Sequence, residues 1–340
     1  MGGEHSGMKR RTTKIVLSIA LLAAVVAAVA TPQLLGTRTA AALNSLHGAD
    51  PIWLAVATLC FAAGFLTAVC AWRTALAASG GRISLRGGTA SLGVGALVNT
   101  FAPARIGDAV KIALFSRAID GPDPVWTAGG VYAAVSAARC LVIAVLVVAA
   151  SLTGALPLWP VFVLCGGVAA LGAFALSSAR WRRYPRVAHL LEGFAALERS
   201  PRFGLQVLAW AAGTGLTRLA ATAALSEALG LPHPLLVALV ICPALDLSSA
   251  LPLTPGNIGV ASGALAVALQ SRGIGVTQAL GVGIAIQALE TVVSLTAGTS
   301  GALYFARPSR FVGRWALRVA AVGLSGGLAL LLGAIFFDLT

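Results

Sequence analysis

The residues best suited to chemistry lie in segment 99–111, which reads Asn-Thr-Phe-Ala-Pro-Ala-Arg-Ile-Gly-Asp-Ala-Val-Lys. Proline lacks an N–H group and disfavours helix in the preceding residue, so one helix should end near Ala102. Gly107 then allows a turn, and the free N–H groups of a new helix, which runs on to Phe115, attract anions. The candidate binding residues are Asn99, Arg105, Asp108 and Lys111, beside helix breaks at Pro103 and Gly107.

The charges in this segment are suited to a phosphate group. The guanidinium of Arg105 offers a fork that matches phosphate oxygens. Lys111 follows six residues later, less than two turns on, and can face the same volume, while Asp108 can orient or neutralise Arg105. The simpler alternative is a solvated loop of ordinary basic residues that includes Arg117. The position beside a helix break favours the binding site.

A second segment, 252–261, has a similar skeleton 152 positions later and reads Pro-Leu-Thr-Pro-Gly-Asn-Ile-Gly-Val-Ala. Two broken segments at corresponding places in two halves are typical of a transporter binding site. This one carries no charge, so Thr254 and Asn257 offer only neutral hydrogen bonds. The segment is therefore interpreted as a cavity wall, a hinge or a tight surface turn. Its helix breaks are Pro255, Gly256 and Gly259.

Four ionisable residues lie inside predicted membrane spans: Arg139, Arg218, Asp246 and Glu290. A charge at the bilayer centre costs about 2.5–3.5 kcal/mol on insertion scales, so each needs a partner or a water-filled cavity. Arg139 and Glu290 occupy nearly equivalent places in the two halves, and we expect them to approach each other. Such a pair suits helix packing as well as transport. Asp246 lies nearer the end of its run and is assigned to the second break.

The composition is that of a polytopic membrane protein. Of 340 residues, 58% are hydrophobic and only 10% are charged, against roughly 25% in soluble domains. The net charge of +13 lies in loops between apolar runs, as the positive-inside bias requires, and no nucleic-acid module is found. The five cysteines and four histidines lack metal-ligand spacing, and no cofactor-binding motif is present. We therefore expect no metal, cofactor or nucleic-acid partner.

The predicted fold is all-α, with about eight transmembrane helices and two short broken or re-entrant helices in two similar halves. Two short apolar pieces, 87–101 and 256–270, are too short to span and lie beside the two breaks. Runs long enough to span are 15–35, 51–78, 125–151, 156–177, 203–229, 235–252, 278–305 and 315–337. The expected organisation is a basic N-terminus (1–14) and one membrane domain (15–340), with halves at about 15–177 and 203–340 and a linker at about 178–202.

The basic clusters predict the orientation. The N-terminal cluster and the arginines at 73–86 and 180–202 fall on the cytoplasmic side if 87–101 dips into the membrane and returns. The arginine cluster at 307–318 then lies on the opposite side of the membrane, unless 256–270 crosses the membrane fully. Whether the two halves are parallel or inverted stays open for the same reason. The first run contains a signal-like Ala28-Val-Ala30, but it continues to Leu35, which favours an uncleaved helix.

Both broken segments resemble a known family. The first is similar to the Asn…Pro-Ala-Arg-x-Gly-Glu-x2-Arg segment of the lysylphosphatidylglycerol synthase transmembrane region, also called the flippase-like domain, with Asp108 in place of the Glu and Lys111 in place of the Arg. The second is similar to the family's Pro-x-Thr-Pro-Gly-Gly-x-Gly segment. There the family usually continues with an acid, whereas this chain has Ser262. That difference weakens a charged role for the second segment.

The resemblance implies a multi-pass protein of the bacterial inner membrane that moves or binds a lipid. The lipid would be an aminoacylated phospholipid or an isoprenoid- or hopanoid-linked one, and a separate lipid-modifying enzyme is a further candidate partner. The aminoacyltransferase domain of full-length synthases does not follow in this sequence, so lipid synthesis is not expected. A lipid flippase is the first hypothesis. A membrane enzyme acting on a lipid-linked phosphate or sugar, and a non-catalytic subunit of an envelope complex, are the alternatives.

Overall fold

The fold was analysed in a computed structural model that describes part of the chain. The described residues are 49–101, 105–120, 123–154, 156, 161–162, 166, 199–249, 269 and 276–305. Within them, the structure is entirely helical and contains no strand. The helices are α3 (Pro51–Ala78), α4 (Leu85–Phe101), α5 (Ile106–Phe115), the short 3-10 helix η1 (Ser116–Ala118), α6 (Pro124–Leu152), α9 (Pro201–Ala228), α10 (Pro234–Ser249) and α12 (Val276–Phe305).

The helices follow the apolar runs of the sequence closely. Five predicted spans and the short piece before the first break coincide with helices whose ends differ by three residues or fewer. Two of the described helices, α3 and α6, are long and apolar enough to cross a membrane. The all-helical fold class is thus confirmed for the described residues. The runs 15–35 and 315–337, the N-terminus 1–14, nearly all of 156–177 and 256–270, and most of the linker 178–202 lie outside them.

Local sequence explains where the helices begin. The Asp50 carboxylate accepts hydrogen bonds from the N–H groups of Ile52 (2.8 Å) and Trp53 (3.4 Å), which would otherwise lack a partner at the start of α3. Proline occupies the first position of α3, α6 and α9, where its missing N–H costs nothing and its fixed φ suits a helix.

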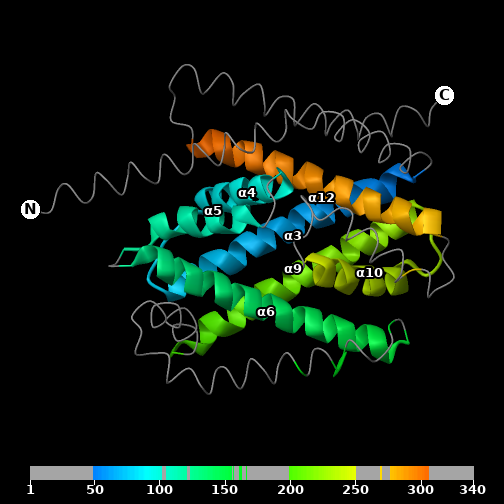
Figure 1. The fold of residues 1–340 in the computed structure, drawn as a ribbon, viewed down its shortest axis with the longest axis horizontal. Coiled ribbons are helices and arrows are strands. Elements are labelled where there is room, and N and C mark those ends of the chain that lie inside the picture. The colour runs from blue at the N-terminus through cyan, green and yellow to red at the C-terminus, as the bar shows by residue number, and fades with distance from the viewer. Residues whose placement is uncertain are drawn as a thin grey trace, which may run out of the picture.

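The helices form a bundle with α3 near its centre (Figure 1). α3 packs along α9 and also contacts α4, α6 and α12. α12 packs along α4, and α5 folds back on α4 to make a helical hairpin. Close approach of α4 and α12 depends on small residues: a Cβ on Gly93 would collide with the backbone carbonyl of Ala297. Such small-residue contacts are how helices pack tightly in a membrane.

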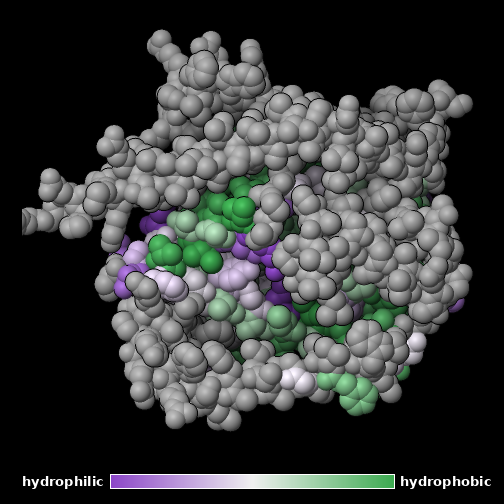
Figure 2. Space-filling view, viewed as in Figure 1, coloured by the Kyte–Doolittle hydropathy of each residue, from purple (hydrophilic) through white to green (hydrophobic). Residues whose placement is uncertain are grey.

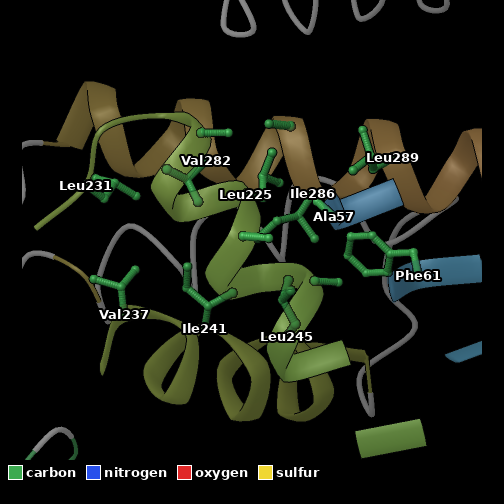
Figure 3. Close-up of a cluster of buried hydrophobic side chains, with 14 of the residues drawn as sticks. Ala57, Phe61, Leu225, Leu231, Val237, Ile241, Leu245, Val282, Ile286 and Leu289 are labelled. Atoms are coloured by element: carbon green, nitrogen blue, oxygen red, sulfur yellow. The ribbon is translucent and has the colours of Figure 1, made fainter. Parts of the chain in front are cut away.

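Two apolar clusters hold the bundle together. The larger joins α3, α9, α10 and α12 through fully buried side chains such as Leu225, Ile241 and Ile286 (Figure 3). The second ties α3 to the hairpin and α6, with Trp72 stacked on Phe115 at 4.3 Å between ring centroids. These two clusters fix the hairpin and α6 in the positions on which the polar sites depend.

Candidate functional site

The first candidate site lies at the turn of the α4–α5 hairpin. α4 ends at Phe101 and α5 begins at Ile106, while Pro103 lies between them, outside the described residues. Arg105 is the residue before α5 and has left-handed backbone angles, with φ 56° and ψ 33°. Few non-glycine residues adopt this conformation, and the helix that follows it, α5, packs on α4. Arg105 therefore lies, exposed, at the amino end of a ten-residue helix.

Asp108, in the first turn of α5, is the centre of a hydrogen-bond network. Its Oδ1 accepts bonds from Asn99 Nδ2 at 2.9 Å and Lys111 Nζ at 2.8 Å, and its Oδ2 accepts one from the Tyr132 hydroxyl at 2.9 Å. These donors come from α4, α5 and α6 respectively. We call Asn99, Arg105, Asp108, Lys111 and Tyr132 the hairpin site. The Asp108 carboxylate thus links α4, α5 and α6 through hydrogen bonds.

The network keeps Asp108 ionised. Burial raises the pKa of its carboxyl, but the charge of Lys111 and the hydrogen bonds from Lys111, Asn99 and Tyr132 outweigh burial and hold the pKa below its usual value. α5 is too short to span a membrane, so this acid lies outside the spanning segments. Arg105, Lys111 and Asp108 together carry a net positive charge, which the helix dipole of α5 reinforces.

Glycine is required where the two arms of the hairpin meet. A Cβ on Gly107 would collide with the carbonyl oxygen of Gly95 and with Asn99 Oδ1. A Cβ on Gly95 would in turn collide with the Lys111 side chain. The glycines bring α4 and α5 close enough for Asn99 and Lys111 to reach the same carboxylate oxygen.

The second candidate site is a cavity of about 260 Å³ between α3, α6, α9, α10 and α12. Four charged residues line it, and we call them with this volume the charged cavity: Arg139, Arg218, Asp246 and Glu290. The remaining lining is mainly apolar, including Phe61, Phe65 and Leu146. A cavity with charged groups on one part of its wall and apolar side chains on the rest suits an amphiphile.

The four charges form a chain of ion pairs. Asp246 Oδ1 accepts hydrogen bonds from Arg139 Nη2 at 2.7 Å and Arg218 Nη1 at 2.8 Å. Arg218 Nη2 also lies 2.8 Å from Glu290 Oε1. Arg139 and Glu290 line the same cavity, and the described ion pairs connect them through Asp246 and Arg218. Their expected approach to each other stays a prediction. Arg218 and Asp246, on α9 and α10, stand between them.

The exposure of the side chains differs along this chain of ion pairs. Asp246 has a side chain only 9% exposed, so two arginines are needed to compensate its desolvated charge. The Asp246 carboxylate, on α10, lies between arginines of α6 and α9, and the second break that it was expected to serve lies outside the described residues. The Arg139 side chain is 52% exposed, and that of Glu290 35%, so the two ends of the chain of ion pairs are the accessible ones.

The second broken segment lies outside the described residues. Thr254, Asn257, Pro255, Gly256 and Gly259 all belong to it. Their proposed role in binding therefore stays a prediction.

Sequence reasoning missed Tyr132. Its hydroxyl joins α6 to Asp108, and this contact crosses 24 positions of sequence. A signal was present: Tyr132, Ser136 and Arg139 are spaced four and three residues apart within an otherwise apolar run, which places them on one helical face.

Comparison with known proteins identifies the family. The family profile described as "Lysylphosphatidylglycerol synthase TM region" matches residues 14–298. The chain belongs to this family. The match includes the hairpin site, the charged cavity and the second broken segment, as the resemblance in the sequence motifs implied. Searches of curated proteins and of solved structures found no match. Membership establishes a membrane protein domain, and the apolar helices α3 and α6 agree with it.

Proposed function

We propose that this protein is a lipid flippase or transporter of the cell inner membrane, with its N-terminus cytoplasmic, that binds a phosphate-bearing lipid headgroup at the hairpin site. The observation that carries the proposal is the position of Arg105. It is exposed at the amino end of α5, in the same site as Lys111 and Asp108, so the site carries a net positive charge. A guanidinium and a helix amino terminus at one point favour an anion with several oxygens.

The charged cavity supports transport rather than binding alone. A headgroup that crosses the membrane must exchange water for other polar partners at each depth, because a charge near the bilayer centre is costly. Arginines and carboxylates in a cavity with apolar walls supply such partners for the headgroup while the acyl chains contact apolar side chains. Membrane lipids, anionic or isoprenoid-linked, are the proposed partners, and a separate lipid-modifying enzyme is a further one.

The geometry is less suited to enzymatic catalysis by Asp108. Its two oxygens already accept three hydrogen bonds and its pKa is held below the usual value, so Asp108 is a weak base. The arrangement instead suits an acid that orients neighbouring helices and Lys111.

The test is the set of lipids that co-purify with the protein, identified by mass spectrometry. Arg105→Ala is compared with the wild type and with Arg117→Ala, a matched control that removes another exposed arginine just after α5. We expect one phosphate-bearing lipid class to be enriched with the wild type and the control and lost with Arg105→Ala. The same lipid profile for all three proteins would contradict the headgroup site.

A further inference from the structure

The hairpin site and the charged cavity are connected along one face of α6. Tyr132 contacts Asp108 of the hairpin site, and Arg139 contacts Asp246 in the cavity. Ser136 lies between them and interacts with the Tyr132 hydroxyl. With about 100° of rotation per residue, these three side chains fall within a narrow sector of the helix. They form a continuous polar stripe from one site to the other.

The opposite face of α6 is apolar and exposed. Leu141, Val145 and Val148 are 51%, 61% and 39% exposed, and they point away from the polar stripe. In a membrane protein such a face suits contact with lipid tails, whereas the polar stripe faces α5, α9 and α10. The polar residues of α6 are thus gathered on the side that leads into the bundle.

Two further observations support continuity. The Arg105 charge interacts electrostatically with both the Tyr132 hydroxyl and the Asp246 carboxylate. Figure 2 shows hydrophilic residues gathered near the centre of the viewed face, between hydrophobic ones. Past Arg139, the same face of α6 continues as Ile143 and Leu146, which line the cavity.

We propose that Tyr132, Ser136 and Arg139 form a polar track on α6, along which a phosphate-bearing headgroup moves between the hairpin site and the charged cavity. The proposal rests on the proposed function. The track is about 10 Å long, seven residues at 1.5 Å each. That is about a third of the 30 Å hydrocarbon core, so the track carries the headgroup through the first part of the crossing. Tyr132 and Ser136 offer hydroxyls on the way, and Arg139 receives the phosphate at the cavity.

Cysteine accessibility tests the track without reference to any particular lipid. In a chain whose five cysteines are replaced by alanine, Ser136→Cys and Val145→Cys are compared in proteoliposomes with a charged, water-soluble methanethiosulfonate reagent. Ser136→Cys should be labelled roughly tenfold faster, because only a thiolate in contact with water reacts. Val145→Cys, on the exposed apolar face, is the matched control. Equal labelling of the two variants would overturn the track.

A second pair of variants retains the native cysteines, in case the cysteine-free chain does not fold. Ser136→Leu places an apolar side chain in the track, and Ala137→Leu places the same side chain on the next, exposed residue. We expect Ser136→Leu to slow translocation of a phosphate-bearing phospholipid roughly tenfold while that lipid still co-purifies, and Ala137→Leu to behave as the wild type. Unchanged translocation by Ser136→Leu would overturn the proposal.

These outcomes separate the track from the proposed function. Loss of the proposed function would appear as identical lipid profiles for the wild type and Arg105→Ala, whatever the labelling of Ser136→Cys. Loss of the track alone would appear as a lipid that depends on Arg105 together with an unlabelled Ser136→Cys.

Discussion

In the hairpin site the aspartate is satisfied mostly by neighbours from one short stretch of sequence, whereas in the charged cavity each partner comes from a different helix. Asn99, Asp108 and Lys111 lie within 13 residues, and only Tyr132 is contributed from further along the chain. Arg139, Arg218, Asp246 and Glu290 come from α6, α9, α10 and α12. The hairpin site therefore depends on local geometry, and the charged cavity depends on the assembly of the whole bundle.

Single substitutions should therefore affect the two sites differently. Removing one ion of the cavity leaves the opposite charges only partly compensated, because the remaining partners are held on other helices. Removing one donor of the hairpin site leaves two others on the same carboxylate. Mutations should thus affect folding most strongly in the cavity and affect local geometry, with the protein still folded, in the hairpin.

The largest expected effect is that of Arg218→Ala. The side chain is 20% exposed and compensates both Asp246 and Glu290, so its loss leaves two carboxylates without this partner. Breaking a buried ion pair costs about 3–5 kcal/mol, enough to lower the yield of folded protein markedly. The measurement is thermal unfolding in detergent. Arg202→Ala, an exposed arginine on the same helix, is the control and should unfold like the wild type. If both variants lost the same amount of thermal stability, the ion pairs of the charged cavity would not be what stabilises the bundle.

Gly107→Ala should have the next largest effect. The added methyl group would collide with the Gly95 carbonyl and with Asn99, so the hairpin must open, at about 1–3 kcal/mol. Gly213→Ala is the control, because its nearest neighbour, Thr67 Cγ2, would be 3.5 Å from the new Cβ, an ordinary contact. Alanine at that position should be neutral or stabilising within a helix. If the two variants unfold alike, the close packing of α4 on α5 is not needed for stability.

Asp108→Asn should destabilise the hairpin less, by about 0.5–1.5 kcal/mol, because the shape and an acceptor oxygen are kept and only the charge opposite Lys111 is lost. The pKa of Asp108 is held below its ordinary value near 3.8, so its carboxylate stabilises the fold above that value. This contribution disappears as the pH falls through the lowered pKa. The difference in melting temperature between wild type and Asp108→Asn should therefore shrink below about pH 4. A difference that is constant down to pH 3 would contradict the assignment.

The smallest expected effect concerns a neutral contact between the cavity wall and α3. Thr67 Oγ1 and Thr214 Oγ1 lie 2.9 Å apart. Hydrogen bonds between membrane helices average about 0.6 kcal/mol, far below the cost of breaking an ion pair. A double-mutant cycle with Thr67→Val and Thr214→Val should give a coupling of that order. A coupling as large as the effect of Arg218→Ala would mean that neutral contacts, rather than charges, hold the cavity together.

The sequence predicts the positions of the helices well because the length of an apolar run and the proline at its start decide them. α3 begins at Pro51 and ends at Ala78, at the same residues as the apolar run. The helix break of the hairpin could also be predicted from the sequence, because Pro103 and Gly107 affect the backbone of their immediate neighbours. These features depend on interactions over a few residues, which the sequence displays directly.

The partners in the charged cavity could not be predicted in the same way. Two arginines and two acids can be paired in several ways, and only the rotation of α9 and α10 about their axes determines which pairs form. Arg218 joins Asp246 and Glu290, and Asp246 in turn joins Arg139, so two residues lie between Arg139 and Glu290 in the chain of ion pairs. The contact of Tyr132 with Asp108 depends in the same way on how α6 packs against α5.

If Arg105 binds the lipid headgroup while the lipid crosses the membrane, translocation in proteoliposomes should depend on this arginine. A fluorescent phosphate-bearing phospholipid is placed in both leaflets, and its exposure to an impermeant quencher is followed over time. We predict that the wild type and Arg117→Ala expose the inner-leaflet lipid, whereas Arg105→Ala, folded and reconstituted to the same level, resembles protein-free vesicles. Equal exposure with Arg105→Ala and the wild type would contradict the claim.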